Sequence, residues 1–238
     1  MKGGVLIIGS LFWQDHLNEV GDDIRKDWRS QRLKMGAAIN VRVPIRYGRF
    51  SGDPKSGNQI YTMVFDNTLP GSQFGTGKFV PFQRDGLDAM GIITEVESLS
   101  RAEGAGTQFI KGSREDNAAW CVCCIAFNPA KVEAEQKQPH INIWREKLTV
   151  NKVGYEVFQK DPSFYSLTAD GELDIKWPDE LREFDFLVAT STRSTTEAIV
   201  EPAEIARSVK NRPYFEPNVQ NGIHTFQNNE ISKELRKL

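Results

Sequence analysis

Near its start the chain reads Val5-Leu6-Ile7-Ile8-Gly9-Ser10-Leu11-Phe12-Trp13. A short apolar run that ends in Gly-Ser is typical of a buried strand followed by a turn. Glycine lets the backbone turn tightly and lets a ligand come close to the main chain. The amide groups exposed after such a turn can hold a carboxylate. An ordinary turn at the end of a strand has the same residues, so this stretch alone leaves both interpretations open.

Further along the chain, alternating apolar residues predict more strands. Between residues 39 and 45 every second residue is β-branched, so these side chains share one face of an extended segment. Pro44 within this segment predicts a sheet edge or a bulge. Arg49–Asn58 is polar and contains Gly, Ser and Pro, which is typical of a loop. The predicted strands lie near Val5, Val41, Tyr61, Val80 and Val122, with one more at Phe186–Thr190.

Helices are predicted where apolar residues recur with a helical period. The strongest pattern is Leu87–Glu103, in which one stripe is apolar and Gly104 can end the helix. Together with the strands, this pattern indicates an α+β fold. We expect a mixed sheet, curved or partly closed into a barrel, with helices around it and a C-terminal α/β extension. The other predicted helices are Asp22 or Asp23 to about Leu33, Ala130–Gln138, Ile141–Leu148, Pro202–Val209 and Asn229–Leu238.

The domain prediction is a single globular unit over residues 1–238, with a core region at about 4–128 and a C-terminal layer at about 129–238. No Gly/Ser-rich or Pro-rich linker separates the two parts. The strand at Phe186–Thr190 is too apolar to stand alone and must pair with the front sheet. Shielding of that sheet is the preferred role for the layer. The alternative is that Arg193, Tyr214 and His224 complete a site.

Composition excludes several classes of protein. The 238 residues include 30 basic and 32 acidic ones, giving a net charge of −2. This balance provides no general field for a nucleic-acid backbone or an anionic membrane, and no apolar run is long enough to span a bilayer. The three cysteines, Cys121, Cys123 and Cys124, form no disulfide framework, and buried strand cysteines are favoured over a zinc site. We expect a cytoplasmic protein without a metal.

Two short motifs resemble the gamma-glutamylcyclotransferase superfamily. Gly9-Ser10-Leu11 is similar to its Gly-Ser-Leu signature near the end of the first strand, and Arg101-Ala102-Glu103-Gly104 is similar to its second landmark, an acidic residue at a helix end. The two motifs are separated by about ninety residues, as in the family. The resemblance covers roughly residues 4–128. It implies that Gly9, Ser10 and Leu11 bind a gamma-glutamyl group and that Glu103 is the general acid/base.

The reaction implied by this resemblance is the cyclising release of 5-oxoproline, or related gamma-glutamylamine chemistry, without an organic cofactor. From the residues alone, Glu103 fits equally well as a solvated carboxylate at the end of a helix. The alternative function is a non-catalytic module that binds a small anionic molecule or the acidic tail of a protein partner in the same pocket.

Arginines near the predicted Gly-Ser turn suit an anionic ligand. Arg42 and Arg46 are four residues apart on a predicted strand and therefore share a face. Arg25, Arg29 and Arg32 add a basic stripe on the first helix. Ordinary surface salt bridges account for the same pattern. The sequence thus predicts a pocket between Gly9–Leu11 and Glu103, with Arg42 or Arg46 at its rim.

Overall fold

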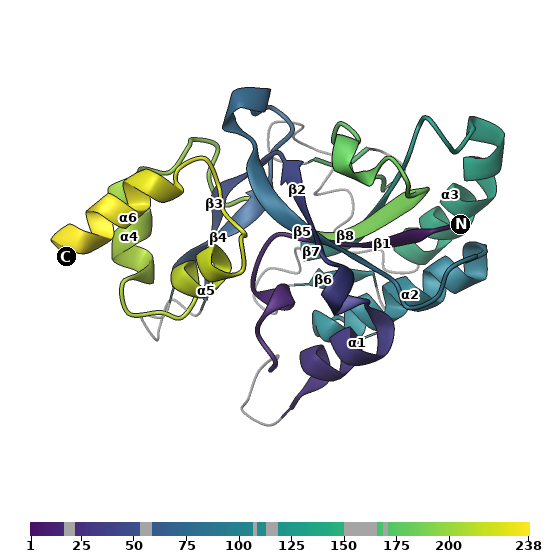
Figure 1. Cartoon of the computed structure of the whole chain (residues 1–238), viewed down its shortest axis with the longest axis horizontal. Coiled ribbons are helices and arrows are strands. Elements are labelled where there is room, and N and C mark those ends of the chain that lie inside the picture. The colour runs from purple at the N-terminus through teal and green to yellow at the C-terminus, as the bar shows by residue number, and fades with distance from the viewer. Residues whose placement is uncertain (17–21, 53–58, 107–108, 113–118, 150–165, 169–170) are drawn as a thin grey trace.

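The computed structural model describes residues 1–16, 22–52, 59–106, 109–112, 119–149, 166–168 and 171–238. Its main feature is a six-stranded mixed sheet (Figure 1). Strand β8 runs parallel to β1, and every other neighbouring pair in the sheet is antiparallel. The strand order is β2 (Ile39–Val43), β5 (Gly75–Pro81), β1 (Gly3–Ile7), β8 (Phe186–Thr192), β7 (Ala119–Phe127) and β6 (Ile110–Gly112).

A second, two-stranded sheet pairs β3 (Ile45–Ser51) with β4 (Ile60–Phe65). Pro44 separates β2 from β3, so the alternating segment is divided between the two sheets. The C-terminal helices α4 (Pro202–Val209), α5 (Phe215–Gln220) and α6 (Asn228–Lys237) lie beside this small sheet, at the end of the molecule away from the N-terminus (Figure 1). We call the β3–β4 sheet together with α4–α6 the ribbon lobe.

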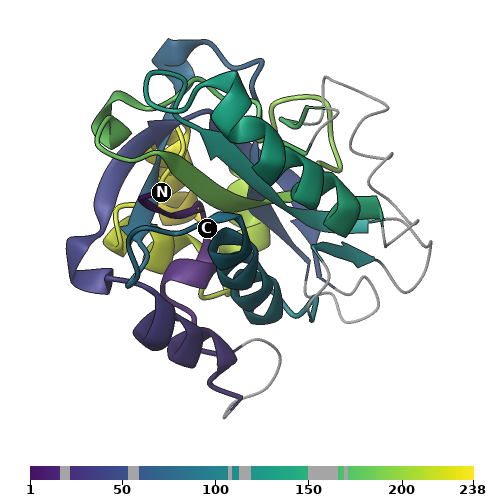
Figure 2. The same cartoon turned by 90° about the vertical axis from the view of Figure 1, so that its right-hand side faces the viewer.

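Three other helices accompany the large sheet: α1 (Ile24–Arg32), α2 (Ala89–Ala102) and α3 (Ala134–Thr149). Figure 2 shows α2 and α3 on the side toward the viewer, with the ribbon lobe behind them. Asp88 caps α2 because its Oδ1 accepts a hydrogen bond from the Gly91 amide at 2.7 Å. Gly104 follows the helix with a φ of +73°, a left-handed conformation that favours glycine.

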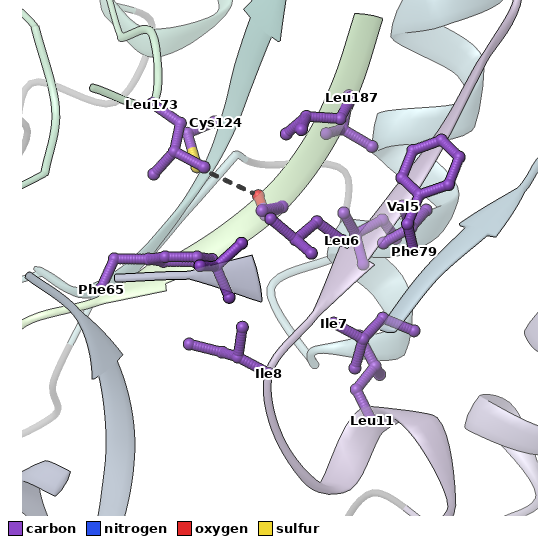
Figure 3. Packing of buried hydrophobic residues seen from close by; sticks show 14 of the residues in the cluster. Val5, Leu6, Ile7, Ile8, Leu11, Phe65, Phe79, Cys124, Leu173 and Leu187 are labelled. Carbon is purple, nitrogen blue, oxygen red and sulfur yellow. Dashed lines mark hydrogen bonds between the residues drawn. The ribbon is translucent and has the colours of Figure 1, made fainter. Parts of the chain in front are cut away.

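Strand β1 forms the centre of the core, and all five of its residues are buried. Val5 pairs with Val80 on one side and with Val188 on the other. Figure 3 shows β1 side chains packed with Phe79 of β5 and Leu187 of β8. Glycine at position 3 permits close packing, because a Cβ there would lie only 2.4 Å from the Phe186 ring.

The α+β class with a mixed sheet is confirmed, although several details of the expectation are wrong. The sheet is open, with β2 and β6 at its edges in the part that the structure describes. The strand near Tyr61 belongs to the small sheet, whereas β8 occupies a central position in the large one. The predicted loop begins too early because β3 continues through Ser51; residues 53–58 lie outside the described ones.

The helix predictions need two corrections. The two helices expected between residues 130 and 148 are one helix, α3, which contains Pro139. Helix α5 was not predicted at all. No helix within the described ranges combines the length and the hydrophobicity required to cross a membrane.

Candidate functional site

A pocket of about 210 Å³ lies between the large sheet and the ribbon lobe. Its size suits a small ligand, since pockets for drug-sized molecules hold about 300–1,000 Å³. Apolar side chains form part of its wall, and hydroxyl groups, one carboxylate and two guanidinium groups form the rest. The lining residues are Ile7, Ile8, Gly9, Ser10, Leu11, Gln14, Arg25, Arg49, Ser51, Thr62, Met63, Glu103, Thr190, Thr192 and Tyr214.

The segment Gly9–Leu11 forms one wall of this pocket. Strand β1 ends at Ile7, and a single 3₁₀ turn over Ser10–Phe12 follows it. The indole of Trp13 donates a hydrogen bond to Asn218 Oδ1 of α5 at 2.8 Å, which ties the turn to the ribbon lobe. A Cβ at position 9 would lie 3.0 Å from the Tyr214 hydroxyl oxygen, so glycine permits this close approach.

Glu103 lies immediately after α2, and its side chain is 13% exposed. Its Oε2 accepts a hydrogen bond from Arg25 Nη2 at 3.1 Å, and its Oε1 accepts one from the Thr190 hydroxyl at 2.9 Å. Arg25 and Thr190 are 78 and 87 positions away from Glu103 in the chain. The carboxylate therefore has a fixed orientation at the junction of α1, α2 and β8.

Arg25 connects the Gly-Ser turn to the end of α2. Its Nε donates to the Ala102 carbonyl at 3.1 Å, and its Nη1 donates to Ser10 Oγ at 3.3 Å and to Gln14 Oε1 at 2.9 Å. One planar guanidinium group thus contacts the turn, Gln14 and the residues around Glu103.

Arg29, one turn further along α1, binds the main chain of the same loop. Its Nη1 donates to the carbonyl oxygens of Leu11 and Gln14, each at 2.8 Å, and its Nη2 pairs with Asp15. Helix α1 therefore fixes the position of the turn through two neighbouring arginines.

Tyr214 brings a buried hydroxyl group to the pocket from the segment before α5. Its oxygen accepts a hydrogen bond from the Met63 amide at 3.3 Å. Burial raises the pKa of this phenol to about 12, and the nearby Glu103 carboxylate acts in the same direction. The phenol is therefore neutral near pH 7 and is available to a ligand as a hydrogen-bonding group.

The prediction that Arg42 or Arg46 stands at the rim is wrong. Arg42 donates to the Gly71 carbonyl at 2.8 Å and lines a separate hollow beside Trp177. Arg46 is 1% exposed and forms a 2.5 Å ion pair with Asp66. The two arginines do not share a face because Pro44 places them on strands of different sheets.

Several residues of the pocket were missed or assigned otherwise by sequence reasoning. Arg49 and Ser51 fall in the segment predicted to be a loop, and Thr190 falls in a predicted strand with no predicted role in the site. Tyr214 lines the pocket, whereas His224 forms a bridge with Thr76 elsewhere. Arg193 contributes its carbonyl oxygen, which accepts a hydrogen bond from Arg49 Nη1 at 2.9 Å. The C-terminal layer therefore does more than shield the sheet.

The cysteines lie in the core and not in the pocket. All three are buried on β7, and burial raises the pKa of the Cys123 and Cys124 thiols. Among the residues that the structure describes, no group of three or more His, Cys, Asp and Glu side chains is arranged to hold a metal ion.

Comparisons with known proteins found no matching family model, no similar curated protein and no similar solved structure. The resemblance to gamma-glutamylcyclotransferases stays a prediction.

Proposed function

We propose that this pocket binds a small gamma-glutamyl compound and that Glu103 promotes its cyclisation to 5-oxoproline. One observation carries the proposal. The Gly9–Leu11 segment and Glu103, which are far apart in the sequence, line the same pocket. These are the two features that the resemblance links to binding and to catalysis. The pocket volume supports a ligand of this size.

In the proposed reaction, Glu103 acts as a general base and then as a general acid. Its carboxylate takes a proton from the α-ammonium group of the ligand, and the resulting amine attacks the γ-carbonyl carbon. A new C–N bond closes the five-membered ring as the bond to the original amine breaks. The proton held by Glu103 passes to the leaving nitrogen, and the second proton that the attacking nitrogen loses on ring closure converts the released amine to its ammonium form. The carboxylate is regenerated and no redox step occurs.

The neighbours of Glu103 support such a role. Arg25 and Thr190 each contact a different carboxylate oxygen, so the side chain is held in one orientation before a ligand binds. Preorganised groups of this kind reduce the reorganisation that a proton transfer needs. The Glu103 side chain is only 13% exposed, so water competes less with its carboxylate for the ammonium group of the ligand.

The same contacts favour a second candidate, a non-catalytic binding module. Because both oxygens of Glu103 already accept hydrogen bonds, the carboxylate is also suited to a purely structural role at the junction of α1, α2 and β8. Such a module would hold a small anionic molecule, or the acidic tail of a protein partner, in the pocket and leave it intact.

The two candidates differ in their product. Purified protein is incubated with gamma-glutamyl dipeptides, glutathione and gamma-glutamylamines, and 5-oxoproline is measured by chromatography. The enzyme hypothesis predicts 5-oxoproline from at least one compound. Ligand-dependent thermal stabilisation with full recovery of the intact compound supports the binding module instead.

The role of Glu103 is tested by Glu103→Gln, which keeps the shape of the side chain and removes its basicity. We expect turnover to be lost and the unfolding midpoint to change little. Glu97→Gln is the matched control because Glu97 lies on α2, pairs with Lys147 and does not line the pocket. Turnover that survives in Glu103→Gln removes Glu103 from the mechanism.

A further inference from the structure

An irregularity in β3 determines which side chains reach the pocket from the ribbon lobe. Tyr47 pairs with Met63 of β4, but Arg49 pairs with Thr62, so the register shifts by one residue between them. Met63 and Thr62 are neighbours on one strand and point to opposite faces. Tyr47 and Arg49 therefore also point to opposite faces, although residues two apart on a regular strand share one.

The extra residue in this bulge is Gly48, and a side chain at this position would crowd its neighbours. A Cβ there would lie 2.6 Å from Val64 Cγ2 and 2.7 Å from Arg46 Nη1. The Gly48 carbonyl accepts hydrogen bonds from the Thr195 amide at 2.8 Å and the Ser194 hydroxyl at 2.7 Å. The chain after β8 thus holds the bulge in place.

The bulge directs Arg49 toward the pocket and not into the core. Tyr47, on the other face, is fully buried, whereas Arg49 and Ser51 line the pocket beyond the bulge. Arg49 is anchored through its Nη1 to the Arg193 carbonyl, and the Thr62 hydroxyl donates to the Arg49 carbonyl at 3.3 Å. Bulges next to binding sites often re-aim a side chain in this way.

The two sides of the pocket carry different charged groups: the paired Glu103 and Arg25 on one side and Arg49 on the other. The carboxylate of Glu103 follows helix α2 and is oriented by Arg25, and the guanidinium of Arg49 comes from the ribbon lobe. A guanidinium group beside hydroxyls matches the planar, two-oxygen geometry of a carboxylate.

We propose that Arg49, with the hydroxyl of Ser51, forms a subsite for a carboxylate group of the ligand. This subsite deepens the function proposed above and rests on it only for the identity of the rest of the ligand. The ligand then carries a carboxylate toward the ribbon lobe and an ammonium group toward Glu103. Arg49 is accordingly a specificity-determining residue, which selects compounds with a carboxylate at this position over carboxamides of the same shape.

The test uses matched probes and measures affinity by calorimetry. The probes are γ-L-glutamyl-L-alanine and its two monoamides, in each of which one carboxylate is replaced by a carboxamide. For the wild-type protein, we expect one of the two amides to bind roughly 10- to 100-fold more weakly than the parent compound. In Arg49→Gln this preference should disappear, and in Arg49→Lys it should be partly retained because the charge remains but the fork is lost.

Arg42→Gln is the matched control, since Arg42 is an arginine of the neighbouring sheet that does not line the pocket. It should keep the wild-type preference. Unfolding midpoints without ligand show whether Arg49→Gln is folded, and the ratio of affinities for acid and amide does not depend on the stability of the free protein.

A second panel separates this inference from the proposed function. It contains glutarate, L-alanine and inorganic phosphate, none of which has a γ-glutamyl group. Binding of glutarate or L-alanine that Arg49→Gln abolishes supports the subsite even where no γ-glutamyl compound binds or reacts.

Three results overturn the subsite. The first is a wild-type protein that binds acids and amides equally, or that binds no carboxylate of either panel at 10 mM, roughly the weak limit for small ligands. The second is an acid preference that persists in Arg49→Gln. The third is a protein that binds phosphate through Arg49 but binds none of the carboxylates, which would make Arg49 part of a phosphate site instead.

Discussion

The two halves of the pocket are built in different ways. On the side of the large sheet, the polar groups are bound to one another: Arg25 holds Glu103, and Thr190 completes the set. On the side of the ribbon lobe, the guanidinium of Arg49 is held by a backbone carbonyl, and its direction is set by a bulge in β3. The first arrangement depends on side chains from three distant elements, whereas the second depends on the path of the main chain.

The two halves of the pocket should therefore respond differently to substitutions. Changes to the large sheet act through the packing of β1 and β8, so they should affect the whole molecule. Changes at the bulge in β3 act through the register of this strand, so they should alter the direction of Arg49 as well as stability. Four substitutions or truncations test this comparison.

Removal of β8 should have the largest effect. A fragment of residues 1–184 lacks the strand between β1 and β7, so we expect it to lose cooperative folding. Thermal unfolding followed by circular dichroism measures this. A fragment of residues 1–226 is the control, because it lacks only α6 and should fold with a lower midpoint. That the chain is one globular unit stays a prediction until then, and a soluble, cooperatively folding 1–184 fragment would contradict it.

Arg46→Met should cost about 3–5 kcal/mol of unfolding free energy, since it leaves the buried Asp66 carboxylate without its charged partner. Arg46 also donates to the Thr196 carbonyl at 2.9 Å, which adds to the loss. Urea denaturation gives the value. The control is Arg42→Met on the neighbouring strand, which should change stability by no more than about 0.5 kcal/mol. Equal effects of the two substitutions would show that the ion pair of Arg46 with Asp66 does not stabilise the fold.

Gly48→Ala should destabilise the protein by about 1–3 kcal/mol, because the added methyl group overlaps Val64 and the Arg46 side chain. It should also weaken the preference for acids over amides by moving Arg49. Gly36→Ala is the matched control, since a Cβ there meets no atom within 4 Å. Urea denaturation and the calorimetric panel measure the two effects. Unchanged stability together with unchanged probe selectivity would argue against the bulge as the positioning element.

Glu95→Gln should have the smallest effect, and its sign should depend on pH. Burial raises the pKa of Glu95 above its usual 4.5, although Arg32 lies 3.5 Å from Oε1. Glu95 Oε2 has no hydrogen-bond partner in the described part of the chain. A raised folded-state pKa favours folding most below pH 4.5, and this contribution is lost as the pH rises through the folded-state pKa.

The glutamine variant is neutral throughout this range. It should therefore match the wild type below about pH 4 and gain about 1 kcal/mol over it at pH 7. Denaturation curves between pH 3.5 and 8 test this prediction. A constant difference between the two proteins across that range would show that the ionisation of Glu95 does not contribute.

Local patterns were sufficient to predict several elements of the site. The apolar run before Gly9 predicted β1 and the turn after it, and the stripe of α2 predicted where Glu103 follows the helix. These predictions succeeded because neighbouring residues determine the periodicity of strands and helices. They also carry the signals that end both kinds of element. The α+β class, the two motifs and their order along the chain could therefore be predicted from local patterns.

The arginines that lie in the pocket could not be predicted from local patterns, because their directions depend on long-range strand pairing. Arg42, Arg46 and Arg49 look alike in sequence, yet one lies over a separate hollow, one is buried with Asp66, and one faces the pocket. Pro44 and the bulge at Gly48 determine their directions, and both act through pairing with distant strands. The contact of Glu103 with Thr190 likewise requires β8 to lie beside β1. A side chain's direction depends on strand register and on long-range packing, and neither is encoded in the residues next to it.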